Sequence, residues 1–261
     1  MAETMTQQLN RPTWVDLSSA DAGAARDFYA KLFNWQVDVN PDPQYGGYAI
    51  AKAGGKDSAG IGPKMDPNAP TAWNLYIGTN DIDGLTEKVK AAGGNVLMAP
   101  MDVGDQGRMA VFADPIGTVI SGWQGQRMGG FQTEAENSLG WAEINGRGVE
   151  KALPFYQQVF GWTPKKSEMS TEGQPPYTEF IESGESIAGA TEMPAMVPAE
   201  VPSYWLVYFY VADVDATHRT ALSLGGHELV APVDFPGGRF SIVSDPQGAS
   251  FGLLKMAPRQ A

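Results

Sequence analysis

Apolar and polar positions show two periodicities along the chain, one typical of strands and one typical of helices, and the same order of these periodicities occurs four times. Residues 13–17 alternate like a short strand, and apolar side chains at 24–32 recur every three or four positions, which is typical of an amphipathic helix. Strand-like segments follow to about residue 65, and a proline-rich link leads to a second strand at 73–79 and a helix ending at Gly93-Gly94. The pattern predicts a β-α-β-β-β module twice in each half of the chain.

The second half of the chain repeats the first with small changes in spacing. Matched positions are Trp14 and Trp141, Trp73 and Trp205, and the Asp-Pro-x-Gly turns at 114–117 and 245–248. The offsets are 127, 132 and 131 residues, so small loop insertions separate the matched elements. We therefore predict a tandem duplication with one domain at 11–126, a linker, and a second domain at 138–257.

Composition narrows the class of protein. Of 261 residues, 43% are hydrophobic and 18% charged, so each half is large enough to bury a core. The net charge of −12 disfavours nucleic acid and anionic membranes as partners. There is no cysteine, which excludes disulfides and thiolate chemistry. Since no leader-like or membrane-spanning apolar run is present, we expect a cytoplasmic protein.

Several motifs occur once in each half. They are Phe28-Tyr29 with Phe33-Asn34-Trp35, Asp81-Ile82-Asp83 before a helix ending in Gly-Gly, and the Asp-Pro-x-Gly turn between two strands. In these motifs the chain resembles the vicinal oxygen chelate (glyoxalase, bleomycin resistance and extradiol dioxygenase) superfamily over about residues 12–256. Within that superfamily, the chain is similar to two-domain actinobacterial proteins described as hydroxylase-like or glyoxalase-like. The resemblance implies an α+β fold, with four βαβββ modules forming two curled sheets, helices outside and a cup-shaped ligand pocket in each.

The resemblance also implies where metal ligands of related enzymes would fall, as His or Glu on four strands. In the first half these positions fall on Trp14, near Gly60, and on Asn74 and Ser121, and in the second on Trp141, near Ala188, and on Leu206 and Gly252. None is His or Glu. The two histidines, His218 and His227, lie at a helix and after a Gly-Gly break, where surface or helix-end roles are expected. We therefore expect no metal and no other cofactor.

Two carboxylates are candidate catalytic groups. Asp16 and Glu143 each follow a tryptophan by two residues and share its strand face, so they face a cup if Trp14 and Trp141 do. A carboxyl group in an apolar cup is suited to acid or base catalysis. The alternative, that these acids hold the first strand in place through a backbone donor or an arginine, is also open.

Aromatic and cationic side chains are candidates for ligand binding. Flat rings bind planar ligands by stacking, although ordinary core packing accounts for many of them. Arg108 and Arg239 each follow a glycine. Each could bind a ligand carboxylate, or it could form an ion pair with Asp16 or Glu143. The candidate ligand-binding residues are Trp14, Asn74, Tyr76, Arg108, Trp123, Trp141, Tyr208 and Arg239.

Two classes of function are compatible with these features. The first is a metal-independent protein that binds an aromatic or amphipathic small molecule, such as an antibiotic or a polyketide-like intermediate. The second is an enzyme of the glyoxalase and dioxygenase superfamily, of a hydroxylase, isomerase or lyase type, acting on a secondary metabolite or a small carbonyl compound. In a metal-free version Asp16 or Glu143 is the base and Tyr or Arg stabilises an enolate. Either fits a monomer or a homodimer with a small-molecule partner.

Overall fold

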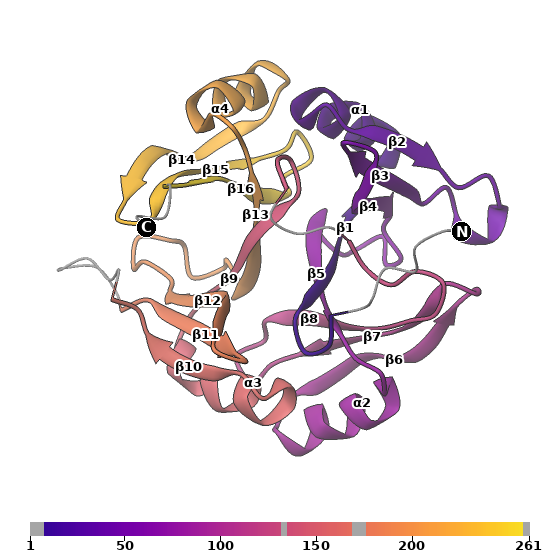
Figure 1. The fold of residues 1–261 in the computed structure, drawn as a ribbon, viewed down its shortest axis with the longest axis vertical. Helices are drawn as coiled ribbons and strands as arrows, with labels where there is room; N and C mark the ends of the chain where they lie inside the picture. The colour runs from indigo at the N-terminus through magenta and orange to yellow at the C-terminus, as the bar shows by residue number, and fades with distance from the viewer. Residues whose placement is uncertain (1–7, 132–134, 169–175, 258–261) are drawn as a thin grey trace. The chain divides into compact units, whose positions relative to one another are not determined.

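A computed structural model describes residues 8–131, 135–168 and 176–257 of the chain, and it consists of four βαβββ modules (Figure 1). Module one comprises β1 (Pro12–Ser19), α1 (Ala22–Phe33), β2 (Gln36–Val39), β3 (Ala49–Ala53) and β4 (Lys56–Pro63), with the short 3-10 helix η1 (Pro43–Tyr45). Module two comprises β5 (Ala72–Gly78), α2 (Ile82–Ala91), β6 (Asn95–Val103), β7 (Gly107–Ala113) and β8 (Val119–Gly125).

The second half repeats this order of elements. Module three comprises β9 (Leu139–Gly146), the short helix η2 (Val149–Lys151), α3 (Leu153–Phe160), β10 (Thr163–Lys166), β11 (Thr178–Glu182) and β12 (Glu185–Glu192). Module four comprises β13 (Tyr204–Tyr210), α4 (Val214–Ser223), β14 (His227–Phe235), β15 (Gly238–Ser244) and β16 (Ser250–Met256). The predicted α+β fold with four βαβββ modules is confirmed.

The strands form two eight-stranded mixed sheets, one from each half. The order is β2-β3-β4-β1-β5-β8-β7-β6 in the first and β10-β11-β12-β9-β13-β16-β15-β14 in the second. Within modules one and two, β1 pairs with β4 and β5 with β8 in parallel, whereas the outer strands pair antiparallel as hairpins. The parallel pairing is possible because the helix and hairpin between the two strands provide a long crossover.

Local sequence explains where the helices begin and end. The Asp21 side chain accepts a hydrogen bond from the Ala24 backbone N–H and so caps α1, and Asp81 caps α2 through Gly84 in the same way. Asn34 ends α1 in the left-handed region at φ 52°, which asparagine tolerates better than most residues. No helix among the described residues has the length and apolar character needed to cross a membrane.

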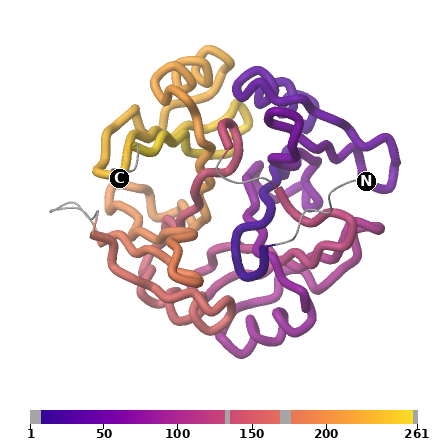
Figure 2. Tube along the Cα trace, viewed as in Figure 1, coloured from indigo at the N-terminus to yellow at the C-terminus, as the bar shows by residue number. Residues whose placement is uncertain are grey.

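The compact units of the structure combine modules from the two halves. The first–fourth unit comprises Val15–Asn74, Phe131–Trp141 and Leu206–Ala261, and the second–third unit comprises Met1–Trp14, Leu75–Gly130 and Ala142–Trp205. In the first–fourth unit α1 lies beside α4, and in the second–third unit α2 lies beside α3 (Figures 1 and 2). Each half therefore contributes one module to each unit.

The core of each unit is rich in aromatic rings. In the first–fourth unit Phe33 on α1 and Trp73 at the start of β5 contact Phe209 on β13, with ring centroids 5.0 Å apart in both pairs. In the second–third unit the stacked pair Tyr156 and Trp162 is fully buried. These aromatic residues close the two cores, as expected for most of the phenylalanines and tryptophans of the repeat.

Candidate ligand-binding site

The first candidate site is a hydrogen-bonded cluster around Asp16 on β1, in the first–fourth unit. Asp16 is only 9% exposed. The Tyr48 hydroxyl donates to its Oδ2 atom at 3.2 Å, and Asn74 Nδ2, at the start of β5, donates to Oδ1 at 2.8 Å. Asn74 Nδ2 also lies 3.0 Å from Ser18 Oγ. Neutral phenol and amide donors thus hold this buried carboxylate, which we call the Asp16 cluster.

The second candidate site is the Glu143 cluster on β9, in the second–third unit. Glu143 is also 9% exposed. The Tyr177 hydroxyl donates to Oε2 at 2.8 Å, and Asn145 Nδ2 donates to Oε1 at 3.2 Å. Burial, together with the negative charge of Glu143, raises the pKa of the Tyr204 phenol, so Tyr204 keeps its proton at neutral pH. The duplication has therefore preserved a phenol–carboxylate pair in both units.

A glycine makes room for the tyrosine in each cluster. Gly60 on β4 is the register partner of Asp16, and Gly189 on β12 is the partner of Glu143. A Cβ atom at Gly60 would lie 1.8 Å from the Tyr48 hydroxyl oxygen, and one at Gly189 would lie 1.9 Å from the corresponding tyrosine hydroxyl. Any larger residue would displace the phenol, so the glycine and the tyrosine belong together.

The positions inferred for metal ligands can be tested against this geometry. Trp14 is a buried indole, Asn74 holds Asp16, and Ser121 is paired in register with Tyr76. In the second half, a Cβ atom at Gly252 would lie 1.9 Å from a carbon of the Tyr208 ring. Within residues 8–131, 135–168 and 176–257 no group of three His, Cys, Asp or Glu side chains is arranged so that it could hold a metal ion. These residues do not fit a transition-metal site, whose usual ligands are imidazole, thiolate and carboxylate.

Behind the Asp16 cluster lies a buried relay of hydrogen bonds. Trp73 Nε1, one residue before Asn74, donates to the Tyr29 hydroxyl at 3.0 Å, and that hydroxyl donates to Asp245 Oδ2 at 3.1 Å. Tyr29 comes from α1 and Asp245 from the Asp-Pro turn of module four. A turn in the second half therefore anchors the strand that carries Asn74.

The second–third unit contains the same relay with the halves exchanged. Trp205 Nε1 donates to the Tyr156 hydroxyl at 3.1 Å, which donates to Asp114 Oδ2 at 3.0 Å. Trp205 directly follows Tyr204 of the Glu143 cluster. Burial raises the pKa of the Asp114 carboxyl, while its bonds with Thr118 and with the phenol oppose that shift.

The two arginines occupy ion pairs with other acids. Arg108 Nη1 lies 2.6 Å from Asp83 Oδ2, and its Nε lies 3.2 Å from Asp102 Oδ1. Arg239 is held in the same way by Asp215 at 2.7 Å and Asp234 at 2.8 Å. The expected alternative in which they pair with Asp16 and Glu143 is therefore corrected: acids at the start of the preceding helix and on the neighbouring strand hold them.

The predicted aromatic residues are distributed over several strands. Trp123 Nε1 donates to the Met128 carbonyl at 3.0 Å, and the Tyr208 ring packs edge-on against Phe240 with centroids 6.2 Å apart. Trp14 is buried in β1, while Trp141 at the same place in β9 is partly exposed. Ten site residues were predicted from the sequence. Two of them, Asn74 and Asp16, are joined by a hydrogen bond.

His218 corrects another expectation. A surface or helix-end role was expected for it, but the residue is 4% exposed, and its Nε2 lies 2.9 Å from Glu228 Oε2 on β14. It packs on the inner side of α4 because Val214, His218 and Ala221 form the buried stripe of that helix.

Five residues of the clusters were not among the candidate site residues: Ser18, Tyr48, Asn145, Tyr177 and Tyr204. A signal for Tyr48 was present, because Tyr48 and Tyr177 differ by 129 positions, as do Gly60 and Gly189. The alternation of side chains along the strands could not predict which carboxylate each tyrosine contacts, because Tyr48 and Tyr177 lie just outside β3 and β11.

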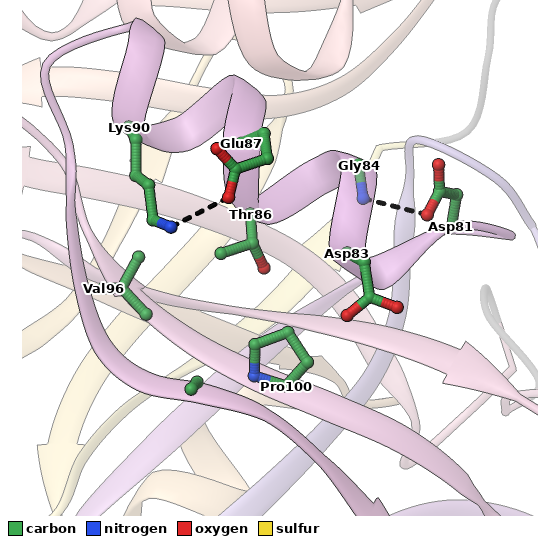
Figure 3. Close-up of a pocket in the computed structure, with 9 residues that line it drawn as sticks. Asp81, Asp83, Gly84, Thr86, Glu87, Lys90, Val96 and Pro100 are labelled. Carbon is green, nitrogen blue, oxygen red and sulfur yellow. Dashed lines mark hydrogen bonds and ion pairs between the residues drawn. The ribbon is translucent and has the colours of Figure 1, made fainter.

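A surface hollow of about 480 Å³ lies elsewhere, between α2 and β6 (Figure 3). Asp81, Asp83, Glu87, Lys90 and Pro100 are among its lining residues. Its polar groups serve the helix, since Asp81 caps Gly84 and Lys90 pairs with Glu87 at 2.8 Å (Figure 3). None of the predicted site residues lines it, so we place the candidate site at the two carboxylate clusters.

Comparison with known proteins identifies the family. The model of the Glyoxalase/Bleomycin resistance protein/Dioxygenase superfamily matches residues 11–121 and 138–253. The chain is 40% identical over 256 residues to the putative glyoxylase CFP32 of Mycobacterium tuberculosis, covering 95% of this chain and 96% of that protein. It is 37% identical over 261 residues to the anthracycline biosynthesis protein DnrV of Streptomyces peucetius, covering 94% and 93%.

Solved structures share the fold at much lower identity. The Mn(II)-bound glyoxalase from Novosphingobium aromaticivorans superposes with a TM-score of 0.63 at 15% identity, covering 96% of this chain and 84% of that chain. A catechol 2,3-dioxygenase superposes with a TM-score of 0.61 at 13% identity, covering 97% and 96%. At this identity the likeness is one of fold.

Proposed function

Because the chain belongs to the glyoxalase/bleomycin resistance protein/dioxygenase superfamily, we propose that it binds an aromatic or amphipathic small molecule at a phenol–carboxylate cluster, without a metal ion. The observation that carries the proposal is the paired geometry of Tyr48 with Asp16 and of Tyr177 with Glu143. Asp16 and Glu143 stand on strands where the superfamily resemblance implies metal ligands. Their oxygen atoms suit hydrogen bonding to a hydroxyl group of a ligand.

The relatives support a class of ligand. DnrV and DauV, both 37% identical to this chain, are named as anthracycline biosynthesis proteins. Anthracyclines contain a flat, hydroxylated quinone ring system. Such a ligand presents hydroxyl donors to a carboxylate and to a phenol oxygen, and its rings bury apolar area. We propose a hydroxylated polycyclic aromatic compound as the ligand.

The test uses protein from which metal ions have been removed with a chelator. The probe is 2,6-dihydroxyanthraquinone, and its binding is measured by the quenching of tryptophan fluorescence. We expect saturable binding that added Mn²⁺, Fe²⁺ or Zn²⁺ does not change. The double variant Tyr48→Phe/Tyr177→Phe should weaken binding about tenfold, since a neutral hydrogen bond between a ligand hydroxyl and a phenol oxygen is worth about 0.5–1.5 kcal/mol. Tyr45→Phe, on η1, is the matched control. Binding that requires an added metal ion, or absence of binding, would overturn the proposal.

One observation favours a second candidate function, a metal-free isomerase. The Glu143 cluster combines a buried carboxylate with Tyr204, a phenol that keeps its proton. In such a reaction Glu143 takes a proton from the carbon beside a ketone, Tyr204 donates a hydrogen bond to the enolate oxygen, and the proton returns to carbon. Deuterium uptake from solvent into 1-tetralone, followed by NMR, would detect this step. An uptake rate unchanged by Glu143→Gln would reject it.

A further inference from the structure

The two clusters differ at three equivalent positions around the acid. Ser18, two residues after Asp16, corresponds to Asn145 in the second half. Asn74 and Ala72 on β5 correspond to Leu206 and Tyr204 on β13. Both clusters have the carboxylate, its tyrosine and the glycine under the tyrosine. The two clusters therefore differ only in the side chains around this shared group.

In the Asp16 cluster, the amide that holds the acid comes from the neighbouring strand. Asn74 Nδ2 lies 2.8 Å from Asp16 Oδ1 and 3.5 Å from the Asp16 backbone oxygen, and it also contacts Ser18. The Asn74 side chain therefore joins β5 to two residues of β1. The relay through Trp73 and Tyr29 fixes β5 from the other face. This arrangement suits a fixed clamp between strands.

In the Glu143 cluster the amide comes from the same strand. Asn145 follows Glu143 by two residues on β9, so its hydrogen bond joins no second strand. Leu206, which replaces the bridging asparagine, is fully buried. Tyr204 lies two residues before Leu206 on β13 and shares its strand face. It is partly exposed, and burial, followed by the negative charge of Glu143, raises its pKa.

We infer that the Glu143 cluster is the ligand contact, with Tyr204 as its specificity-determining residue, and that the Asp16 cluster is a clamp joining β1 to β5. This inference rests on the proposed function. Glu143 accepts a hydrogen bond from a ligand hydroxyl, while Tyr204 donates one to a ligand carbonyl or phenol oxygen. The ligand class is an aromatic compound that carries both groups on one edge.

The binding experiment compares variants of the full chain with 2,6-dihydroxyanthraquinone and its dimethyl ether. Glu143→Gln should weaken binding of the hydroxylated probe about tenfold or more and change binding of the ether less than about twofold, because the ether has no hydroxyl to donate. Tyr204→Phe should weaken binding of both probes about tenfold, because both keep the carbonyl that accepts its hydrogen bond. Asp16→Asn should weaken the hydroxylated probe less than about threefold. A larger loss in Asp16→Asn than in Glu143→Gln would reverse the assignment and overturn the inference.

A melting experiment tests the same inference without a probe. Each variant copies the equivalent residue of the other half: Asn74→Leu in the Asp16 cluster and Asn145→Ser in the Glu143 cluster. Because Asn74→Leu removes the clamp, we expect its melting temperature to fall by about 3 °C or more. The melting temperature of Asn145→Ser should fall by less than about 1 °C. Equal decreases would overturn the inference. Failure of wild-type protein to bind the probe would instead reject the proposed function, while the melting comparison still decides the clamp.

Discussion

At the scale of single residues, small side chains decide where large ones lie. Gly60 and Gly189 have no Cβ atom, and the phenols of Tyr48 and Tyr177 occupy that space within hydrogen-bond reach of an acid. A strand position that the family resemblance assigns to a metal ligand is thus occupied by the ring of a residue from outside the strand. The glycine and the phenol above it therefore depend on each other for space.

Substitution of Gly60 by alanine should be costly for this reason. The new methyl carbon would meet the Tyr48 hydroxyl oxygen at 1.8 Å. We expect Gly60→Ala to lower the free energy of unfolding by about 1–3 kcal/mol, as overpacking does elsewhere. Urea unfolding measures this. In a Tyr48→Ala background the same substitution should cost much less, and equal costs in both backgrounds would contradict the steric explanation.

Two buried carboxyls predict a particular pH dependence. Burial raises the pKa of Asp114 and Asp245 above the ordinary value of 3.8. The folded protein then holds protons that the unfolded chain has lost, so the contribution of these groups to stability falls as pH rises from 3.8 through the raised values. The unfolding free energy of wild type, minus that of Asp114→Asn/Asp245→Asn, should decrease over this window and be flat above it. An increasing difference would contradict the direction of the shifts.

At the scale of elements, the buried relays connect a helix, a strand and a turn. Tyr29 on α1 joins Trp73 on β5 to the Asp245 turn before β16, and Tyr156 on α3 does the same for Trp205 and Asp114. Both tyrosines are fully buried. Because a buried polar group without a partner is costly, these hydroxyls specify how helix and turn meet.

Removal of one relay hydroxyl should therefore destabilise the protein without a large change in volume. Tyr29→Phe leaves the Trp73 indole N–H and the Asp245 carboxyl each with one hydrogen bond fewer. We expect a loss of about 2–4 kcal/mol in urea unfolding, and a similar loss for Tyr156→Phe. Tyr45→Phe, on η1, should stay within about 0.5 kcal/mol. A loss for Tyr29→Phe as small as that of the control would show that the relay is not stabilising.

At the scale of the whole molecule, the compact units cross the boundary of the sequence repeat. Modules one and four form one unit, and modules two and three form the other. Helices from different halves lie side by side in each unit, α1 with α4 and α2 with α3 (Figure 1). Each half of the chain thus supplies an incomplete part of two cores, whereas the family model matches each half separately at 11–121 and 138–253.

This regrouping predicts how a divided chain behaves. A polypeptide ending at residue 131 exposes faces of modules one and two that modules four and three cover in the intact chain. We expect it to aggregate or self-associate, and to recover a cooperative thermal transition when co-expressed with residues 135–261. Light scattering after gel filtration and circular dichroism measure both properties. A monomeric first half that melts cooperatively at the temperature of the intact chain would contradict the prediction.

The sequence by itself determined the repeat, the four modules and the fold class, because strand alternation, helix spacing and caps such as Asp21 and Asp81 are local properties of the chain. It also identified Asp16, Glu143 and Asn74 as candidates. The partners of these groups were decided only by the tertiary structure. Tyr48 reaches Asp16 across 32 positions and Asp245 reaches Tyr29 across 216, and ion pairs with Asp83 and Asp215 engage the arginines. Such pairings depend on which strands and turns meet in space, and periodicity along a single chain does not carry that information.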